Sequence, residues 1–146
     1  MYELVDRPVE RLSEGSRFLL WAMRAWTDSL GRRQCPPGAL AGVFLRAGVI
    51  EALPDFHRLL TTFSREAKIV LGLAPMHCGR ISEDEAILLS LWSDAEREPL
   101  RAQATLELLI QTDAVPNAFQ ALLTTAQQLR GAGLPPLGLA ATAAEG

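Results

Sequence analysis

Residues 12–31 read LSEGSRFLLWAMRAWTDSLG, and this stretch is the strongest indication of the fold class. Phe18 and Trp21 make the middle of the stretch apolar almost all round, Gly15 interrupts the pattern near its start, and Gly31 ends it. The stretch therefore predicts a long, aromatic-rich helix that other helices surround. Its main apolar stripe consists of Leu12, Leu19, Met23, Trp26 and Leu30. These residues are seven, four, three and four positions apart, which places them on one face of a helix.

The rest of the chain repeats the helical period in shorter amphipathic segments. Such segments are stable only when they pack against other helices, because a short isolated helix does not recover its nucleation free energy. The most secure boundary is the capping box of Ser82 and Glu85, where each side chain can accept a hydrogen bond from a free backbone amide at the helix start. The further helices are expected to begin near residues 36, 54, 83, 99 and 118, and the one that begins at 99 is expected to run to Thr112.

Residues 68–79 read KIVLGLAPMHCG and break this rhythm. They combine the β-branched pair Ile69 and Val70 with two glycines and a proline, which is typical of an extended, partly buried connection or a lone strand. We therefore expect an all-α fold: an irregular, orthogonal bundle of five to six helices around the long first helix, with a non-helical crossover near residues 68–81.

The composition agrees with one helical domain. Leu and Ala dominate the hydrophobic 49% of the 146 residues, and both are good helix formers. The predicted domain covers residues 1–133, and residues 134–146 form an irregular tail rich in Pro and Ala. Thirteen of the 14 basic residues are Arg, a bias typical of a GC-rich genome, so a bacterial source is expected.

The net charge of −3 disfavours nucleic-acid binding, which requires a basic face. The first residues lack the charged start and apolar core of a secretory signal. No apolar run approaches the roughly 20 residues that span a bilayer. We therefore expect a cytoplasmic protein without a membrane partner, in which cysteines stay reduced.

The chain contains two Cys and two His, and two thiolates with two imidazoles would complete a tetrahedral metal shell. Cys35, His57, His77 and Cys78 are therefore the candidate ligands of a zinc or iron ion. Their spacings of 22, 20 and 1 lack the close pair that most structural zinc sites have, and adjacent residues of an extended segment point to opposite faces. The alternatives are a thiol centre at Cys78 with His77, or ordinary packing and surface side chains.

Four aromatic residues exceed what one side of a surface helix would bury. Phe18, Trp21 and Trp26 lie on the first predicted helix, and Trp92 lies on the fourth. Two interpretations stay open: the first helix is central within its own domain, or it meets a second copy of the chain. A homodimer through these aromatic residues fits the frequency of two-fold assemblies and of Trp at interface centres.

The charge pattern suggests two other surfaces. Residues 83–98 hold six acids and one Arg, a net charge of −5, which is either a solvated face or a docking surface for a basic partner. A helix-turn-helix is the other alternative, because Arg32 and Arg33 precede a short helix and Arg58 with Arg65 lies on the next.

The leading hypothesis is a small cytoplasmic protein that is not an enzyme and works by protein association, as a homodimer. A metal- or thiol-dependent protein is the first alternative, and a helix-turn-helix regulator is the second. No catalytic residue is predicted, since no motif in the chain specifies a reaction.

Overall fold

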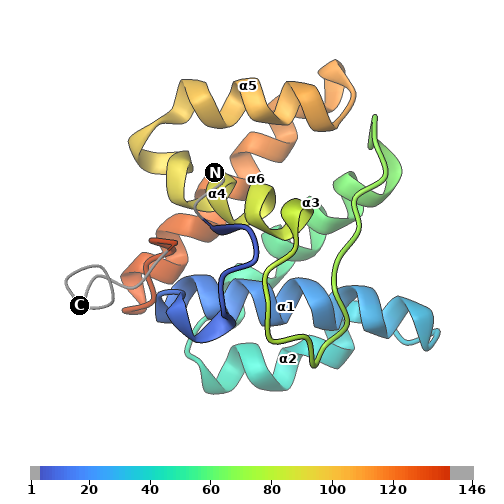
Figure 1. Ribbon diagram of the computed structural model, residues 1–146, viewed down its shortest axis with the longest axis vertical. Coiled ribbons are helices and arrows are strands. Elements are labelled where there is room, and N and C mark those ends of the chain that lie inside the picture. Colours follow the sequence, from blue (N-terminus) through green and yellow to red (C-terminus); the bar gives the residue numbers. More distant parts are fainter. Residues whose placement is uncertain (1–3, 139–146) are drawn as a thin grey trace.

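The computed structural model describes residues 4–138, and every regular element in that range is helical, which confirms the all-α fold (Figure 1). Short 3₁₀ turns precede α1, α3 and α6, at Val9–Arg11, Ile50–Ala52 and Thr112–Ala114 respectively. None of the described helices is both long and apolar enough to cross a membrane. The six helices are α1 (Glu14–Gly31), α2 (Pro36–Arg46), α3 (Leu53–Arg65), α4 (Glu83–Arg97), α5 (Pro99–Leu109) and α6 (Val115–Gly131).

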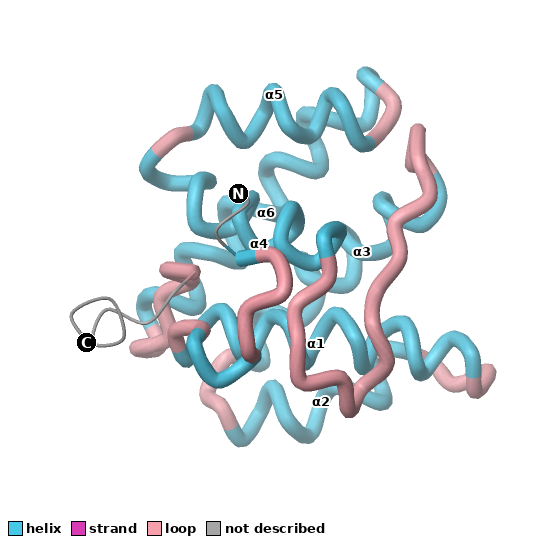
Figure 2. Tube along the Cα trace, viewed as in Figure 1, coloured by secondary structure: helices cyan, strands magenta, loops and turns pink. Residues whose placement is uncertain are grey.

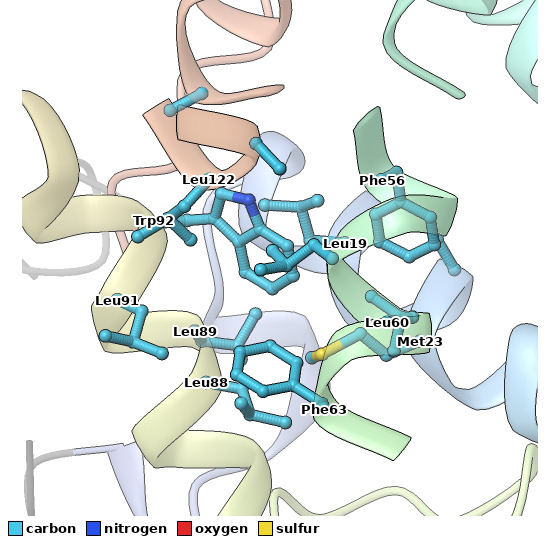
Figure 3. Close-up of a cluster of buried hydrophobic side chains, with 14 of the residues drawn as sticks. Leu19, Met23, Phe56, Leu60, Phe63, Leu88, Leu89, Leu91, Trp92 and Leu122 are labelled. Carbon is cyan, nitrogen blue, oxygen red and sulfur yellow. The ribbon is translucent and has the colours of Figure 1, made fainter. Parts of the chain in front are cut away.

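The helices form an irregular bundle. The long α1 packs on α2 and α4, while α6 packs on α3, α4 and α5. The two halves meet where α1 packs on α4 and where α2 packs on α3. Trp92 of α4 stacks on Phe56 of α3 with ring centroids 6.0 Å apart. Figure 3 shows apolar side chains from α1, α3, α4 and α6 converging on one core, among them Leu19, Met23, Leu60, Phe63, Leu88, Leu89 and Leu122.

The first helix begins later than its apolar pattern, at Glu14, because Ser13 caps it with a hydroxyl that accepts a hydrogen bond from the Ser16 amide at 3.2 Å. Gly15, which interrupts the pattern, lies under the C-terminal segment: a Cβ there would be 2.2 Å from the carbonyl oxygen of Leu134. Residues 134–138 therefore pack on α1, and the rest of the predicted tail, residues 139–146, lies outside the described residues.

The fifth helix is shorter than predicted. It ends at Leu109 because Ile110 takes an extended conformation, with φ −131° and ψ 166°, and forms an isolated bridge with Ala67. The buried Ile110 side chain and the hydrogen bond from the Lys68 amide to the Leu109 carbonyl, at 2.7 Å, fix this ending.

The crossover is confirmed as a non-helical connection, which Figure 2 shows as the long loop between α3 and α4. Within the described part of the chain it forms no strand, because it pairs only at its ends, where Ala67 bridges Ile110 and Arg80 bridges Pro8. The capping box that follows it is also confirmed, with the Ser82 hydroxyl accepting from the Glu85 amide and the Glu85 carboxylate accepting from the Ser82 amide.

Candidate functional site

A buried ion pair holds the crossover in place. The Arg24 guanidinium of α1 donates two hydrogen bonds to the Glu85 carboxylate of α4, Nε to Oε2 at 2.8 Å and an Nη to Oε1 at 2.9 Å. The same guanidinium donates to the carbonyl oxygens of Cys78 at 2.7 Å and Arg80 at 2.9 Å. Both charged side chains are almost fully buried, and the pair therefore joins α1, α4 and the crossover.

Hydrogen bonds complete the environment of both charges. Besides Arg24, the Glu85 carboxylate accepts from the backbone amides of Ser82 at 2.9 Å and Ala74 at 2.8 Å. Burial raises the pKa of Glu85, but these hydrogen bonds outweigh burial and hold it below its usual value. The hydrogen bond to Glu85 likewise raises the pKa of Arg24. Both groups therefore stay charged near neutral pH, and their role is to position the crossover.

An apolar groove of about 450 Å³ lies between α1, α3 and the crossover. Trp26, Phe63 and Leu88 form part of its buried wall, and Lys68 is the charged residue at its margin. Its other lining residues are Thr27, Leu30, Leu60, Ser64, Ala67, Ile69, Val70, Leu71 and Leu73. A groove of this size and polarity is typical of binding sites.

The part of the crossover beside this groove has a free backbone edge. On its inner edge, the Gly72 amide donates to the Asp84 carboxylate at 2.6 Å and the Ala74 amide donates to Glu85. Successive residues of an extended chain direct their N–H and C=O groups to opposite edges. The backbone groups of Leu71 and Leu73 therefore face away from α4. Neither residue makes a backbone hydrogen bond to any part of the chain that the structure describes, and the same holds for Ile69 and Val70.

The side chains alternate in the same way. Val70 is 94% exposed, whereas Leu71 and Leu73 are half-buried against the core. Residues 70–73 therefore have one face on the protein and one in water, as an edge strand has, whereas Ile69 lies at a bend and is 47% exposed. We call residues 69–73 together with the groove the crossover face.

The four predicted metal ligands are spread over three parts of the fold. Cys35 is exposed at the start of α2, and His57 is half-buried on α3. His77 and Cys78 lie in the crossover, where the Cys78 thiol donates to the carbonyl of Arg80 at 3.4 Å. Among residues 4–138 no three His, Cys, Asp or Glu side chains form a group able to hold a metal ion, so the geometry adds no support to the zinc or iron site.

His57 has a different partner. The Trp26 indole N–H donates to His57 Nδ1 at 3.0 Å, which requires a neutral imidazole with its proton on Nε2. Burial lowers the pKa of His57. The bond ties α1 to α3 at the groove wall, because Trp26 also lines the groove.

This arrangement predicts a pH-dependent stability. As the pH falls below about 6.5, His57 is protonated first in the unfolded chain, so the free energy of unfolding falls and levels off below the lowered folded pKa. Urea titrations between pH 7.5 and 5.5 measure the slope. In the variant His57→Gln the slope over this interval should shrink, and an unchanged slope would contradict the assignment.

The predicted aromatic interface is divided by the fold. Trp26 and Trp92 are only 5% and 1% exposed and belong to the core of their own chain, so they offer a second copy little surface. Phe18 and Trp21 are half-buried, and Phe18 packs edge-on against Phe44 of α2 at 4.9 Å between centroids. The central-helix interpretation explains most of the aromatic excess.

The acidic residues of the segment 83–98 do not form one solvated strip. Glu85 is buried with Arg24, Asp84 accepts from Gly72, and Glu96 pairs with Arg130 of α6. These carboxylates hold the fold together, which leaves less charge to attract a basic partner. On α3, the basic Arg58 of the helix-turn-helix alternative pairs with Asp55.

Comparisons with protein-family models, curated proteins and solved structures returned no match. The candidate site therefore rests on the geometry of this chain, and it is the crossover face. Sequence reasoning missed it, although the pair Ile69 and Val70 within a loop was a usable signal, since exposed β-branched residues are typical of strand edges.

Proposed function

We propose that the protein works by association, and that it binds a protein partner through the crossover face. The observation that carries this proposal is Val70, a large apolar side chain that is 94% exposed on a segment with a free backbone edge, beside an apolar groove. We further propose the cytoplasm of a bacterium as the setting.

Two physical arguments support this function. An unpaired edge of extended backbone is a ready template for another chain, whose amides and carbonyls gain partners there while alternate side chains enter a groove. The ion pair of Arg24 and Glu85 also fixes the crossover before binding, so less conformational entropy is lost when a partner arrives.

A photo-crosslinking amino acid at position 70 tests the proposal in the cells that make the protein. We expect a defined covalent adduct, identified by mass spectrometry, because position 70 should lie within the interface. Position 45 on α2 is the matched control, since Leu45 is also a large exposed apolar residue but lies outside the groove.

The two positions separate specific association from chance encounters. Adduct formation at position 70 that exceeds that at position 45 by about ten-fold would support the crossover face. Equal labelling at the two positions would reject it.

A further inference from the structure

We infer that the pair of Trp26 and His57 is a pH-sensitive switch on the groove of the crossover face: neutral His57 holds the indole in the groove wall, and protonation of His57 releases it. This inference rests on the proposed function and adds its regulation, so that association through the crossover face weakens as the pH falls. The contact that carries it is the hydrogen bond from the Trp26 indole N–H to His57 Nδ1, at 3.0 Å between the two nitrogens.

This hydrogen bond exists in one protonation state only. Nδ1 of the neutral imidazole has a lone pair that accepts the indole N–H, whereas both nitrogens of the charged imidazolium carry hydrogens and neither can accept. Two N–H groups would then point at each other across the contact. Trp26 is only 5% exposed, and a buried donor that loses its acceptor is unfavourable. Protonation of His57 therefore removes the interaction that fixes the indole between α1 and α3.

Trp26 connects His57 to the groove. The two rings lie 6.0 Å apart between centroids, and the Trp26 side chain also lines the groove of about 450 Å³ that Leu71 and Leu73 of the crossover line. The groove offers space into which a released indole can turn, and this movement changes the wall that a partner contacts. A partner that needs the formed groove binds the protein with neutral His57 more tightly, so its affinity falls as His57 is protonated.

The surroundings of His57 place this transition on the acid side of pH 6.5. Arg58, Arg65 and Glu66 of α3 line the surface hollow beside the imidazole, and Arg58 already forms an ion pair within its own helix. No charged residue of α2 or α6 lines this hollow among the residues that the structure describes, and α1 presents the uncharged Trp26. Burial lowers the pKa of His57 from its usual 6.5, with no contribution from a described charged side chain. The imidazole is half-buried, so solvent can protonate it in the folded protein.

Nuclear magnetic resonance of the ¹⁵N-labelled full chain between pH 7.5 and 5.0 tests the switch and needs no partner. We expect the Trp26 indole signal and the amide signals of Leu71 and Leu73 to shift with one common midpoint, which equals that of the His57 ring and lies below 6.5. The midpoint is shared because an indole that turns changes the ring-current field at the groove residues. Separate midpoints, or unchanged signals at Leu71 and Leu73 while His57 titrates, would overturn the inference.

Two substitutions separate the switch from general effects of acid. His57→Gln offers Trp26 a side-chain oxygen that accepts at every pH, so the shifts at Trp26 and Leu71 should disappear. His77→Gln is the matched control, because it removes the other histidine, which is exposed in the crossover and does not line the groove. Shifts that persist in His57→Gln, or that vanish in His77→Gln, would overturn the inference. If His57→Gln does not fold, the comparison of the unmodified chain with His77→Gln still decides.

The crosslink at position 70 connects the switch to association. In extracts of the same cells, lowering the pH from 7.5 to 5.5 should reduce the adduct by at least about three-fold with His57 present and leave it unchanged with His57→Gln. An adduct that does not depend on pH, or that depends on it equally in both, would overturn the regulatory role. No adduct at either pH would reject the proposed function, whereas the magnetic resonance titration alone decides whether the groove responds to pH.

Discussion

Replacing Arg24 with alanine is expected to lower the free energy of unfolding by about 3–5 kcal/mol, the range found when one partner of a buried ion pair is removed. The loss leaves the buried Glu85 carboxylate without its counter-charge, and it leaves the carbonyls of Cys78 and Arg80 without their donor. Urea denaturation followed by circular dichroism measures the change.

Arg32→Ala is the matched control, because it removes an Arg from the same helical region whose partner Asp28 is exposed. We expect that change to stay below about 1 kcal/mol. If Arg24→Ala does not fold, Arg24→Lys keeps the charge but loses the two-pronged geometry, and it should fall between the two. Similar losses for Arg24→Ala and Arg32→Ala would contradict a supporting role for the buried pair.

Gly15→Ala is expected to destabilise the protein by about 1–3 kcal/mol, the usual range for overpacking. Alanine in a helix is ordinarily better than glycine by about 0.5–1 kcal/mol, so the expected sign is the reverse of the helix propensity. The reason is the C-terminal segment, since the new Cβ would lie 2.2 Å and 2.4 Å from the carbonyl oxygens of Leu134 and Pro135. Thermal unfolding by calorimetry measures the shift.

Gly31→Ala at the other end of α1 provides the control. A Cβ there meets nothing within 4 Å, so the substitution should be neutral or stabilise by up to about 1 kcal/mol. Opposite signs for the two substitutions would locate the effect in the contact with the C-terminal segment. A stabilising Gly15→Ala would show that this segment does not pack on α1 in solution.

The Arg24 and Gly15 substitutions should differ in their effect on association through the crossover face. Arg24 holds the backbone of residues 78 and 80 directly, so a folded Arg24 variant should also associate more weakly. Gly15 lies at the opposite end of α1 from Trp26, which lines the groove. Its substitution should therefore change stability with little effect on association.

Helix boundaries could be predicted where neighbouring residues determine them. The capping box of Ser82 and Glu85, the prolines that begin α2 and α5, and Gly31 at the end of α1 act within one helical turn, so sequence spacing is sufficient. The apolar period likewise predicted the all-α class. The end of α5 could not be predicted this way, because its bridge partner Ala67 is distant in sequence.

Local residue patterns were sufficient to predict which segments are helical and where the crossover interrupts them, because hydrophobic period and capping depend on neighbouring residues. Tertiary packing alone buries Arg24 against Glu85, 61 residues away. It also decided that Trp26 and Trp92 are internal while Val70 is exposed. Burial depends on which surfaces meet when helices pack, and the residues next to a position in the sequence do not specify which distant residues will pack against it.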